Sequence, residues 1–446
     1  MCDTFVATGD FTKSGNMIFG KNSDREPNEA QSLEVHAARQ KSNSKRKATY
    51  IEVPDAESRP VLLGRPFQMF GAEMGVNDKG VVIGNEAVFT KIPKLKKNSG
   101  LNGMDMLRLA LERADSTDGA LEVITSLLEE FGQDGCGGYE DTSFFYHNSF
   151  LIADGKTARV LETADRFWVS KPVHGYYAIS NGLTIGEDYD LSSANLADLA
   201  LKAGYRKKSQ PMNFAQVFSD TFYTTMGKCK IRRSLSEQKG AQSAASGFTV
   251  KDAMTVLRSH NPKHPDDPSR SGLDSLCVHA AGLLAPSQTT NSLIVEVGTK
   301  GIAQIFATGT SAPCISMFKP VAIANDNHPL LVHEENAPAG SWAIPGKHED
   351  QSLWWQHEGL HRRVLASYAE LAPLIQQDVK PYEDSWLQSK QPADAKLTEE
   401  AFAKHFELLS VWKKKIKERL PTIAPPRRPL YRMYWSKRNR VLKEAL

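Results

Sequence analysis

The chain has 446 residues, of which 40% are hydrophobic and 24% charged, and its formal net charge is +3 at pH 7. These values are typical of a globular protein with one large domain or two to three smaller ones, and they exclude a disordered chain. The charge indicates no nucleic-acid partner, and the absence of a long apolar run or a signal-peptide pattern indicates no membrane partner.

The N-terminal residues predict a β-hairpin. "CDTFVAT" and "MIFG" are rich in strand-forming residues, and "DFTKSGN" between them has the composition of a turn. With a turn centred between Thr12 and Gly15, Cys2 pairs with a residue between Ser23 and Glu26. The polar stretch "KNSDRE" would then face Cys2, and such a cluster directly after a strand is typical of a functional site.

Cys2 stands directly behind the initiator methionine, which allows two interpretations. It is either a small buried side chain or, once Met1 is removed, the first residue of the mature protein. In the second case one residue carries both a thiol and an α-amine, and an α-amine titrates near pH ~8. The amine can then act as a base for its own thiol.

The middle of the chain predicts strands, then two helices, then more strands. "GAEMGVNDKGVVIGNEAVF" reads as a meander in which the strand "GVVIGN" ends on Asn85, and "MDMLRLALERADSTDGALEVITSLLEEFG" reads as two amphipathic helices with a break at residues 115–119. Strand patterns return in "SFLIAD", "ARVLETA", "RFWVSKPV", "GYYAISNG", "SLIVEVG" and "IAQIFATG". This order predicts an α+β fold of layered helices and mainly antiparallel sheets.

The composition changes near Pro320, and long helical patterns follow from Gln351 to Arg419. We therefore predict two parts, a catalytic domain over residues 2–320 and a mainly helical extension over residues 321–446. The last 36 residues carry twelve Lys or Arg against two Glu. We interpret this basic tail as a solvated face or a contact in a homo-oligomer rather than as a nucleic-acid site.

Five cysteines are scattered along the chain without a C-x-x-C pair. An odd number without such spacing favours a reducing, cytoplasmic location over a disulfide framework or a thiolate zinc site. We therefore expect no metal and no other cofactor. Four cysteines are interpreted as packing residues, namely Cys136, Cys229, Cys277 and Cys314.

Eight blocks in the same order resemble the secernin and dipeptidase A-type cysteine dipeptidases. They are "CDTFVA", "FGKNSDREPNEAQ", "GMDMLRLALERA", "HNSFLIAD", "YYAISNGLTIG", "SQTTNSLIVEV", "FATGTSAPCISMFKP" and "LWWQHEGLHR", and they run from Cys2 to about Arg363. That family is similar to the N-terminal-nucleophile (Ntn) hydrolases, which include penicillin V acylase and bile-salt hydrolase. The resemblance implies an αββα four-layer sandwich of two antiparallel sheets, activated by exposing the cysteine as a new N-terminus.

The resemblance also implies roles around the nucleophile. Cys2 matches the nucleophile, and Asp24 matches the aspartate that holds the α-amine. Lys21 stands where the acylases have an arginine, which keeps the charge but loses the planar fork, so Arg25 is a candidate to share that task. Asn22 is assigned with Arg25 to substrate binding, and this basic lining favours a substrate with a carboxylate.

Three further positions follow from the same resemblance. Asn85 and Asn181 match two asparagines, one a donor to the oxyanion and the other a positioner of cysteine and substrate. "CKIRRS" offers two arginines near the nucleophile; we assign Arg233 to catalysis and Arg232 to substrate binding, although the sequence leaves this choice open. The alternative interpretation of the asparagines and of Asp24 is a capping or turn role.

We thus predict a cysteine-type Ntn hydrolase of amide bonds, with a dipeptide or another small molecule as substrate. One alternative is an N-acyl amidase or acyltransferase of the penicillin acylase type, and another is a catalytically silent secernin-like regulatory protein. "HEGLH" at residues 357–361 satisfies H-E-x-x-H and gives a zinc peptidase as a weaker alternative. A Cys2–His279 dyad is a further weak alternative.

Overall fold

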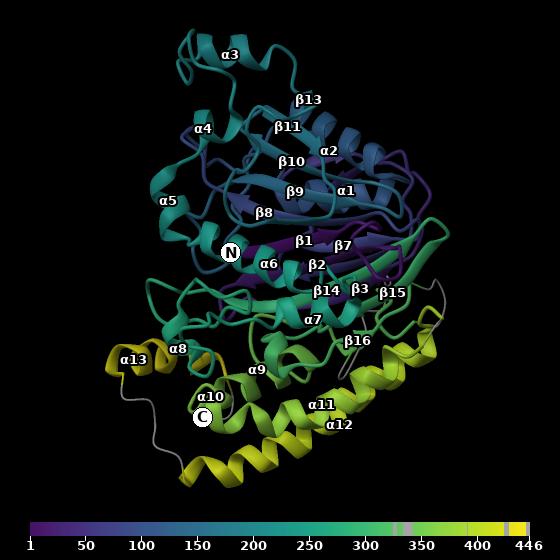
Figure 1. Ribbon diagram of the computed structural model, residues 1–446, viewed down its shortest axis with the longest axis vertical. Coiled ribbons are helices and arrows are strands. Elements are labelled where there is room, and N and C mark those ends of the chain that lie inside the picture. The colour runs from purple at the N-terminus through teal and green to yellow at the C-terminus, as the bar shows by residue number, and fades with distance from the viewer. Residues whose placement is uncertain (324–327, 333–341, 390, 423–427, 443–446) are drawn as a thin grey trace.

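Two stacked β-sheets form the centre of the molecule, and helices cover both outer faces (Figure 1). This computed structural model describes residues 1–323, 328–332, 342–389, 391–422 and 428–442. Within these ranges, no helix has the length and apolar character needed to cross a membrane. The helix–sheet–sheet–helix order confirms the predicted α+β, αββα sandwich.

The first sheet has six strands in the order β12-β1-β2-β14-β15-β16, and every neighbouring pair is antiparallel. Their bounds are β12 (Tyr176–Ile179), β1 (Cys2–Ala7), β2 (Met17–Arg25), β14 (Gln288–Gly298), β15 (Gly301–Ala307) and β16 (Lys319–Pro320). Cys2 pairs with Ser23 across the β1–β2 hairpin. This register lies at one end of the predicted range and confirms the hairpin.

The second sheet has eight strands in the order β13-β11-β10-β9-β8-β7-β6-β3. Their bounds are β13 (Leu191–Ser192), β11 (Phe167–Pro172), β10 (Ala158–Ala164), β9 (His147–Ala153), β8 (Val82–Val88), β7 (Met74–Asn77), β6 (Val61–Pro66) and β3 (Gln31–His36), and a separate ribbon joins β4 (Lys45–Lys47) to β5 (Glu52–Pro54). The prediction that the strand ends on Asn85 is wrong. The ladder with β9 continues to the pair Val88–His147, which places Asn85 in the middle of β8.

Helices α1 (Gly103–Arg113) and α2 (Thr117–Phe131) cover the outer face of the eight-stranded sheet and confirm the two predicted helices. The break between them follows from capping, because the Ser116 side chain accepts a hydrogen bond from the Gly119 N–H at 3.2 Å and starts α2. Their apolar faces bury Leu107, Leu111 and Ile124 against this sheet.

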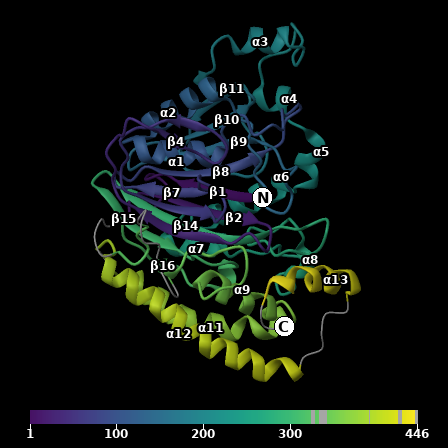
Figure 2. The same cartoon turned by 180° about the vertical axis from the view of Figure 1, so that it is seen from behind.

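Helices on the opposite side cover the six-stranded sheet (Figure 2). Directly beneath it lie α6 (Cys229–Gln242) and α7 (Val250–Leu257), and beyond them α9 (Leu353–Val364), α10 (Tyr368–Leu371), α11 (Pro373–Trp386), α12 (Ala395–Arg419) and α13 (Pro429–Arg438). The shorter elements are α3 (Leu196–Lys202), α4 (Phe214–Phe218), α5 (Thr221–Met226), α8 (Pro268–Ser271) and the 3-10 turns η1 (Pro313–Ile315), η3 (Leu420–Thr422) and η4 (Asn439–Val441).

The C-terminal helices pack onto the sandwich. Trp412 and Ile416 of α12 belong to the same buried apolar cluster as Leu293 and Val295 of β14. In the basic tail, Trp435 of α13 is buried, so part of the tail packs on the protein. The boundary at residue 320 stays a prediction, since the helices beyond it share a core with the sheet.

Candidate active site

Cys2 opens β1 and is buried, with 4% of its surface exposed. Its Sγ accepts a hydrogen bond from the Asp24 backbone N–H at 3.3 Å and donates to Oε2 of Glu73 at 3.7 Å. Burial raises the pKa of the thiol to about 12, against the opposing charge of Lys21. The thiol is therefore protonated at neutral pH and needs a base before it can attack a carbonyl.

The Cys2 nitrogen is held by two side chains from different elements. Asn181, just after β12, accepts the Cys2 N–H through Oδ1 at 2.9 Å. The same oxygen accepts from Nη2 of Arg232 at 2.6 Å, and Asn181 Nδ2 donates to the Ala87 carbonyl at 2.8 Å. Because removal of Met1 turns this nitrogen into the α-amine, these contacts fix the position of the predicted base.

Asp24 lies beside the N-terminus. The Met1 amine donates to its carbonyl oxygen at 2.7 Å, and its carboxylate Oδ1 accepts from the Thr289 hydroxyl at 2.6 Å. Oδ2 is buried, has no hydrogen-bond partner among the described residues and lies 3.8 Å from Nη1 of Arg232. Burial raises the pKa of Asp24 to about 7, although the N-terminal charge opposes this shift. Asp24 thus has an oxygen that accepts no hydrogen bond among the described residues and can accept one from the α-amine.

Arg232 of α6 joins these groups. Its Nη1 donates to Asp3 at 2.6 Å and to the Cys2 carbonyl at 3.1 Å, and its side chain is fully buried. Asp3 and Asp24 are on the face of the sheet that packs against α6, because side chains alternate along a strand. Arg232 therefore compensates two buried carboxylates next to the nucleophile.

Lys21 and Glu86 form a buried ion pair between the two sheets. Lys21 Nζ donates to Glu86 at 2.9 Å and to the Asn85 carbonyl at 2.8 Å, and neither side chain is exposed. Burial raises the pKa of Glu86 to about 7, while Lys21 opposes the shift. Lys21 therefore lies near the thiol with the positive charge that the sequence predicts, but the Glu86 carboxylate neutralises this charge.

Asn85 is not at the thiol, in contrast to the sequence prediction. Gly84 and Glu86 face Lys21, so the side chain of Asn85 between them is on the opposite face of β8. There its Nδ2 donates to Oδ1 of Asn148 at 3.1 Å and to the Ser149 carbonyl at 3.4 Å. The structure gives no oxyanion donor at this position.

Substituting Asn85 should therefore affect stability more than catalysis. We expect Asn85→Ala to keep kcat/KM within a few-fold, whereas loss of an oxyanion donor costs about 10²–10³-fold in kcat. Thermal unfolding should shift downward, because Asn148 loses a buried donor. Steady-state kinetics and a melting curve on the same preparation check this; a kcat loss near 10³-fold would return Asn85 to the oxyanion role.

Two further predicted residues also lie outside the site. Arg233 is 30% exposed and pairs with Glu237 at 2.8 Å, because adjacent residues of a helix point in different directions. The choice between the two arginines thus falls on Arg232 as the residue beside Cys2. Asn22 is buried in the sheet and donates to the carbonyls of Leu257 and Leu276, both at 2.8 Å, so its amide supports the backbone.

A cavity of about 330 Å³ borders Cys2. Its charged lining is mainly acidic, and comprises Asp24, Arg25, Glu26, Glu29, Glu73 and Asp141. Arg25 is itself bound by Glu73 at 2.8 Å and by Glu29. The predicted basic lining is therefore wrong: Lys21, Arg25, Arg232 and Arg233 each pair with a carboxylate of the protein.

Three residues at the site were not predicted from the sequence. Glu73 contacts the thiol, Glu86 neutralises Lys21, and Thr289 holds Asp24. Thr289 lies in the block "SQTTNSLIVEV", which already carried the resemblance, so that block held a usable signal. Glu73 and Glu86 reach the site only through the pairing of distant strands, and nothing in their local sequence marks them.

The two histidines of "HEGLH" diverge, in contrast to a zinc-peptidase site. His357 Nδ1 lies 3.2 Å from Nε2 of His405, whereas His361 Nε2 lies 2.9 Å from Nδ1 of His279. Glu358 is bound by Arg362 at 2.6 Å and is not available as a base. The zinc-peptidase alternative is therefore wrong. Both ring nitrogens of His279 contact other histidines, Nδ1 a nitrogen of His361 and Nε2 a nitrogen of His260, so His279 is also not placed on Cys2.

The chain is similar to one family model and to several solved structures. A family model described as acyl-coenzyme A:6-aminopenicillanic acid acyl-transferase matches residues 11–136. Penicillin V acylase from Agrobacterium tumefaciens is 12% identical with a TM-score of 0.41, covering 75% of this chain and 89% of that one. Conjugated bile acid hydrolase from Clostridium perfringens is 12% identical with a TM-score of 0.40, covering 69% and 88%. An N-acylethanolamine-hydrolyzing acid amidase ortholog from Caenorhabditis elegans is 12% identical with a TM-score of 0.35, covering 66% and 92%.

Proposed function

We propose that the protein hydrolyses amide bonds with Cys2 as an N-terminal nucleophile after removal of Met1. The observation that carries this proposal is the position of the Cys2 nitrogen, held by Asn181 at 2.9 Å on a residue whose thiol borders a cavity. The match of residues 11–136 to an acyl-transferase family model supports acyl transfer to a nucleophile. The grouping with secernins and dipeptidase A-type enzymes is part of the proposal.

The α-amine moves the proton in both halves of the reaction. It accepts the thiol proton as Sγ attacks the amide carbonyl carbon, and it returns this proton to the leaving amine when the C–N bond breaks. A water molecule then gives a proton to the α-amine and attacks the thioester. The acid product leaves, and the proton returns to Sγ.

Asp24 stabilises the protonated α-amine in this scheme, which predicts an acidic limb in the pH profile. Below its pKa of about 7 the Asp24 carboxyl is neutral and loses its attraction for the ammonium. We expect log kcat/KM to rise with pH, because both the Asp24 carboxyl, with its pKa of about 7, and the α-amine must lose a proton; Asp24→Asn should lower the plateau and remove the Asp24 part of this limb, leaving that of the α-amine. Kinetics from pH 5 to pH 9 test it; an unchanged limb in Asp24→Asn would contradict the assignment.

The charge of the cavity supports a substrate with a free amino group. Five carboxylates and one arginine line it, and that arginine is already paired. A dipeptide brings an α-ammonium close to its scissile bond, which these carboxylates can bind. We therefore propose dipeptidase activity. The aromatic and apolar part of the lining, which includes Phe89, Phe144, Tyr223 and Leu284, favours an N-acyl amidase as the second candidate.

A matched pair of substrates separates these candidates. A dipeptide and its N-acetyl derivative have the same scissile bond and differ in the ammonium. The proposal predicts at least about tenfold higher kcat/KM for the free dipeptide, because acetylation removes a charged contact. The reverse preference would favour the N-acyl amidase.

Two parts of the proposal concern the chain in its cell. A chain that keeps Met1 would lack the α-amine on Cys2. If the protein turns over neither the dipeptide nor its N-acetyl derivative, this result would favour the silent, regulatory alternative. A cytoplasmic location belongs to the proposal because all five cysteines are free. The dipeptide and its N-acetyl derivative should be assayed on protein whose N-terminus, with or without Met1, has been determined.

A further inference from the structure

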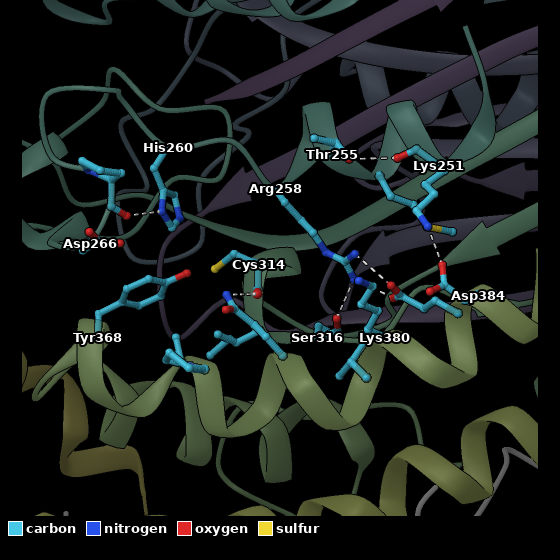
Figure 3. Close-up of a pocket in the computed structure, with 18 of the residues that line it drawn as sticks. Lys251, Thr255, Arg258, His260, Asp266, Cys314, Ser316, Tyr368, Lys380 and Asp384 are labelled. Atoms are coloured by element: carbon cyan, nitrogen blue, oxygen red, sulfur yellow. Dashed lines mark hydrogen bonds and ion pairs between the residues drawn. The ribbon is translucent and has the colours of Figure 1, made fainter. Parts of the chain in front are cut away.

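Four side chains of types that commonly bind metals meet next to the six-stranded sheet, on its face that points away from the eight-stranded sheet. His260 follows α7, Cys277 and His279 lie in the loop before β14, and Cys314 is in η1. One donor atom from each lies within 4.8 Å of the others. Figure 3 shows His260 and Cys314 facing each other beside Tyr368, at one end of a cavity of about 440 Å³.

The three distances from His279 Nε2 match the edges of a tetrahedron around an ion. His279 Nε2 lies 3.2 Å from Nε2 of His260, 3.5 Å from Sγ of Cys277 and 3.4 Å from Sγ of Cys314. With Zn–N near ~2.05 Å and Zn–S near ~2.3 Å, the edges of a zinc tetrahedron measure about 3.35 Å between nitrogens and about 3.55 Å between nitrogen and sulfur. The three distances agree with these edges to within about 0.2 Å.

Hydrogen bonding alone does not account for the cluster. A ring nitrogen of histidine makes one good hydrogen bond, either as donor or as acceptor, yet His279 Nε2 has three polar neighbours at contact distance. Cys277 and His279 are almost completely buried, so unmatched donors or acceptors are costly. A cation at the centre satisfies all four groups at once.

The outward ring nitrogens of both histidines have partners that fit metal ligation. His260 Nδ1 lies 2.9 Å from the Pro265 carbonyl, and His279 Nδ1 lies 2.9 Å from Nε2 of His361. His361 Nδ1 in turn lies 3.2 Å from the Glu358 carboxylate. Histidines that bind a metal typically donate their other N–H to a carbonyl or a carboxylate-linked partner, which leaves Nε2 free for the ion.

We propose that His260, Cys277, His279 and Cys314 bind one structural Zn²⁺. Four protein donors complete a tetrahedral S₂N₂ sphere and leave no open position for a substrate, which is typical of a structural and not a catalytic zinc. The "HEGLH" segment then has a role in this site: His361 and Glu358 orient a ligand without binding the ion.

The zinc supports the active site through Thr289. Val278, between two of the ligands, exchanges hydrogen bonds with Thr289 at 2.9 and 3.0 Å. Ala312, two residues before the fourth ligand, donates its N–H to the Thr289 carbonyl at 2.9 Å. Since the Thr289 hydroxyl holds the Asp24 carboxylate, the ion fixes two loops that position this residue.

The metal content of the full-length protein tests the proposal without any activity assay. Protein purified without chelators should hold about one zinc per chain by elemental analysis. After exchange for cobalt, it should show thiolate-to-cobalt charge-transfer absorption and the intense visible bands of a tetrahedral ion. The proposal would be overturned if the purified protein holds no metal and takes up neither zinc nor cobalt under reducing conditions. A Cys277–Cys314 disulfide, or iron or copper in place of zinc, would also overturn it.

Matched cysteine variants locate the ion. Cys277→Ser and Cys314→Ser should each lower zinc affinity at least about tenfold and weaken the thiolate absorption, because each removes a thiolate ligand. Cys229→Ser is the control, since Cys229 is equally buried but donates to the Thr224 carbonyl elsewhere. If the ligand variants do not fold, the cobalt spectrum of the wild type still decides. Full zinc binding in both ligand variants would contradict the assignment.

Discussion

Replacing Cys2 with alanine should abolish amide hydrolysis while the fold persists. The thiol is the only atom group of the proposed scheme that bonds to the substrate, so kcat/KM should fall at least about 10³-fold. The fold should persist because the change removes one sulfur beside a cavity, and Asn181 binds the backbone nitrogen, which alanine keeps. Initial rates on a dipeptide and a thermal melt of the same preparation measure both effects.

Two companion variants sharpen this experiment. Cys2→Ser should keep a small residual rate, because a hydroxyl is harder to deprotonate than a thiol. Cys229→Ser should keep full activity, since within the described part of the chain that buried thiol donates to the Thr224 backbone carbonyl and contacts no group of the proposed scheme. Unchanged turnover in Cys2→Ala, with Met1 removed, would rule out the thiol mechanism.

Lys21→Met should strongly destabilise the protein. Lys21 and Glu86 are both fully buried 2.9 Å apart, and removing one partner leaves the other charge uncompensated in the core. Such a change typically costs about 3–5 kcal/mol of the free energy of unfolding. Chemical denaturation at pH 8 measures it. The exposed pair Lys396–Glu400 is the matched control, and Lys396→Met should cost much less.

The pH dependence of this loss has a defined sign. The pKa of Glu86 is already raised to about 7 by burial, and loss of Lys21 raises it further. The folded variant then keeps the Glu86 proton that the unfolded chain releases above its ordinary pKa, so its stability falls as the pH rises. The difference from wild type should be larger at pH 8 than at pH 5. Adding Glu86→Gln to the Lys21→Met variant should recover part of the lost free energy of unfolding. A loss below about 1 kcal/mol in Lys21→Met, with no recovery in the double variant, would contradict the ion pair.

The elements set by local sequence were predictable. The β1–β2 hairpin joins strands separated by a short turn, so the turn position alone predicted a partner for Cys2 between Ser23 and Glu26, and Ser23 is the partner in the structure. The capped pair α1 and α2 followed from apolar spacing and the residues between them. Both depend on contacts within about 30 residues, where sequence patterns act directly.

The site was harder to predict because it depends on which way a side chain points. Asn85 was expected at a strand end but lies inside β8, where alternation turns it away from Lys21. Arg232 and Arg233 are neighbours in sequence, and only the packing of α6 decides which reaches Cys2. A resemblance gives the residue type at a position, whereas its direction is a property of the assembled layers.

The four proposed zinc ligands show the same limit over a longer distance. They come from three segments between His260 and Cys314 and contain no C-x-x-C pair, and by spacing alone this pattern predicts no thiolate zinc site. The segments meet only because α7 and η1 both pack against β14, the strand into which the loop with Cys277 and His279 leads. Spacing along the chain therefore carried no signal of their proximity.

The central claim is that Cys2 becomes an N-terminal nucleophile, and mass spectrometry of the N-terminal peptide tests it most directly. Intact protein and its N-terminal peptide are measured before and after a short pulse of iodoacetamide at neutral pH. We expect Met1 to be absent, the α-amine to be unmodified and Cys2 to be alkylated faster than the other four cysteines. Retained Met1, or a blocked amine with an unlabelled Cys2, would contradict it.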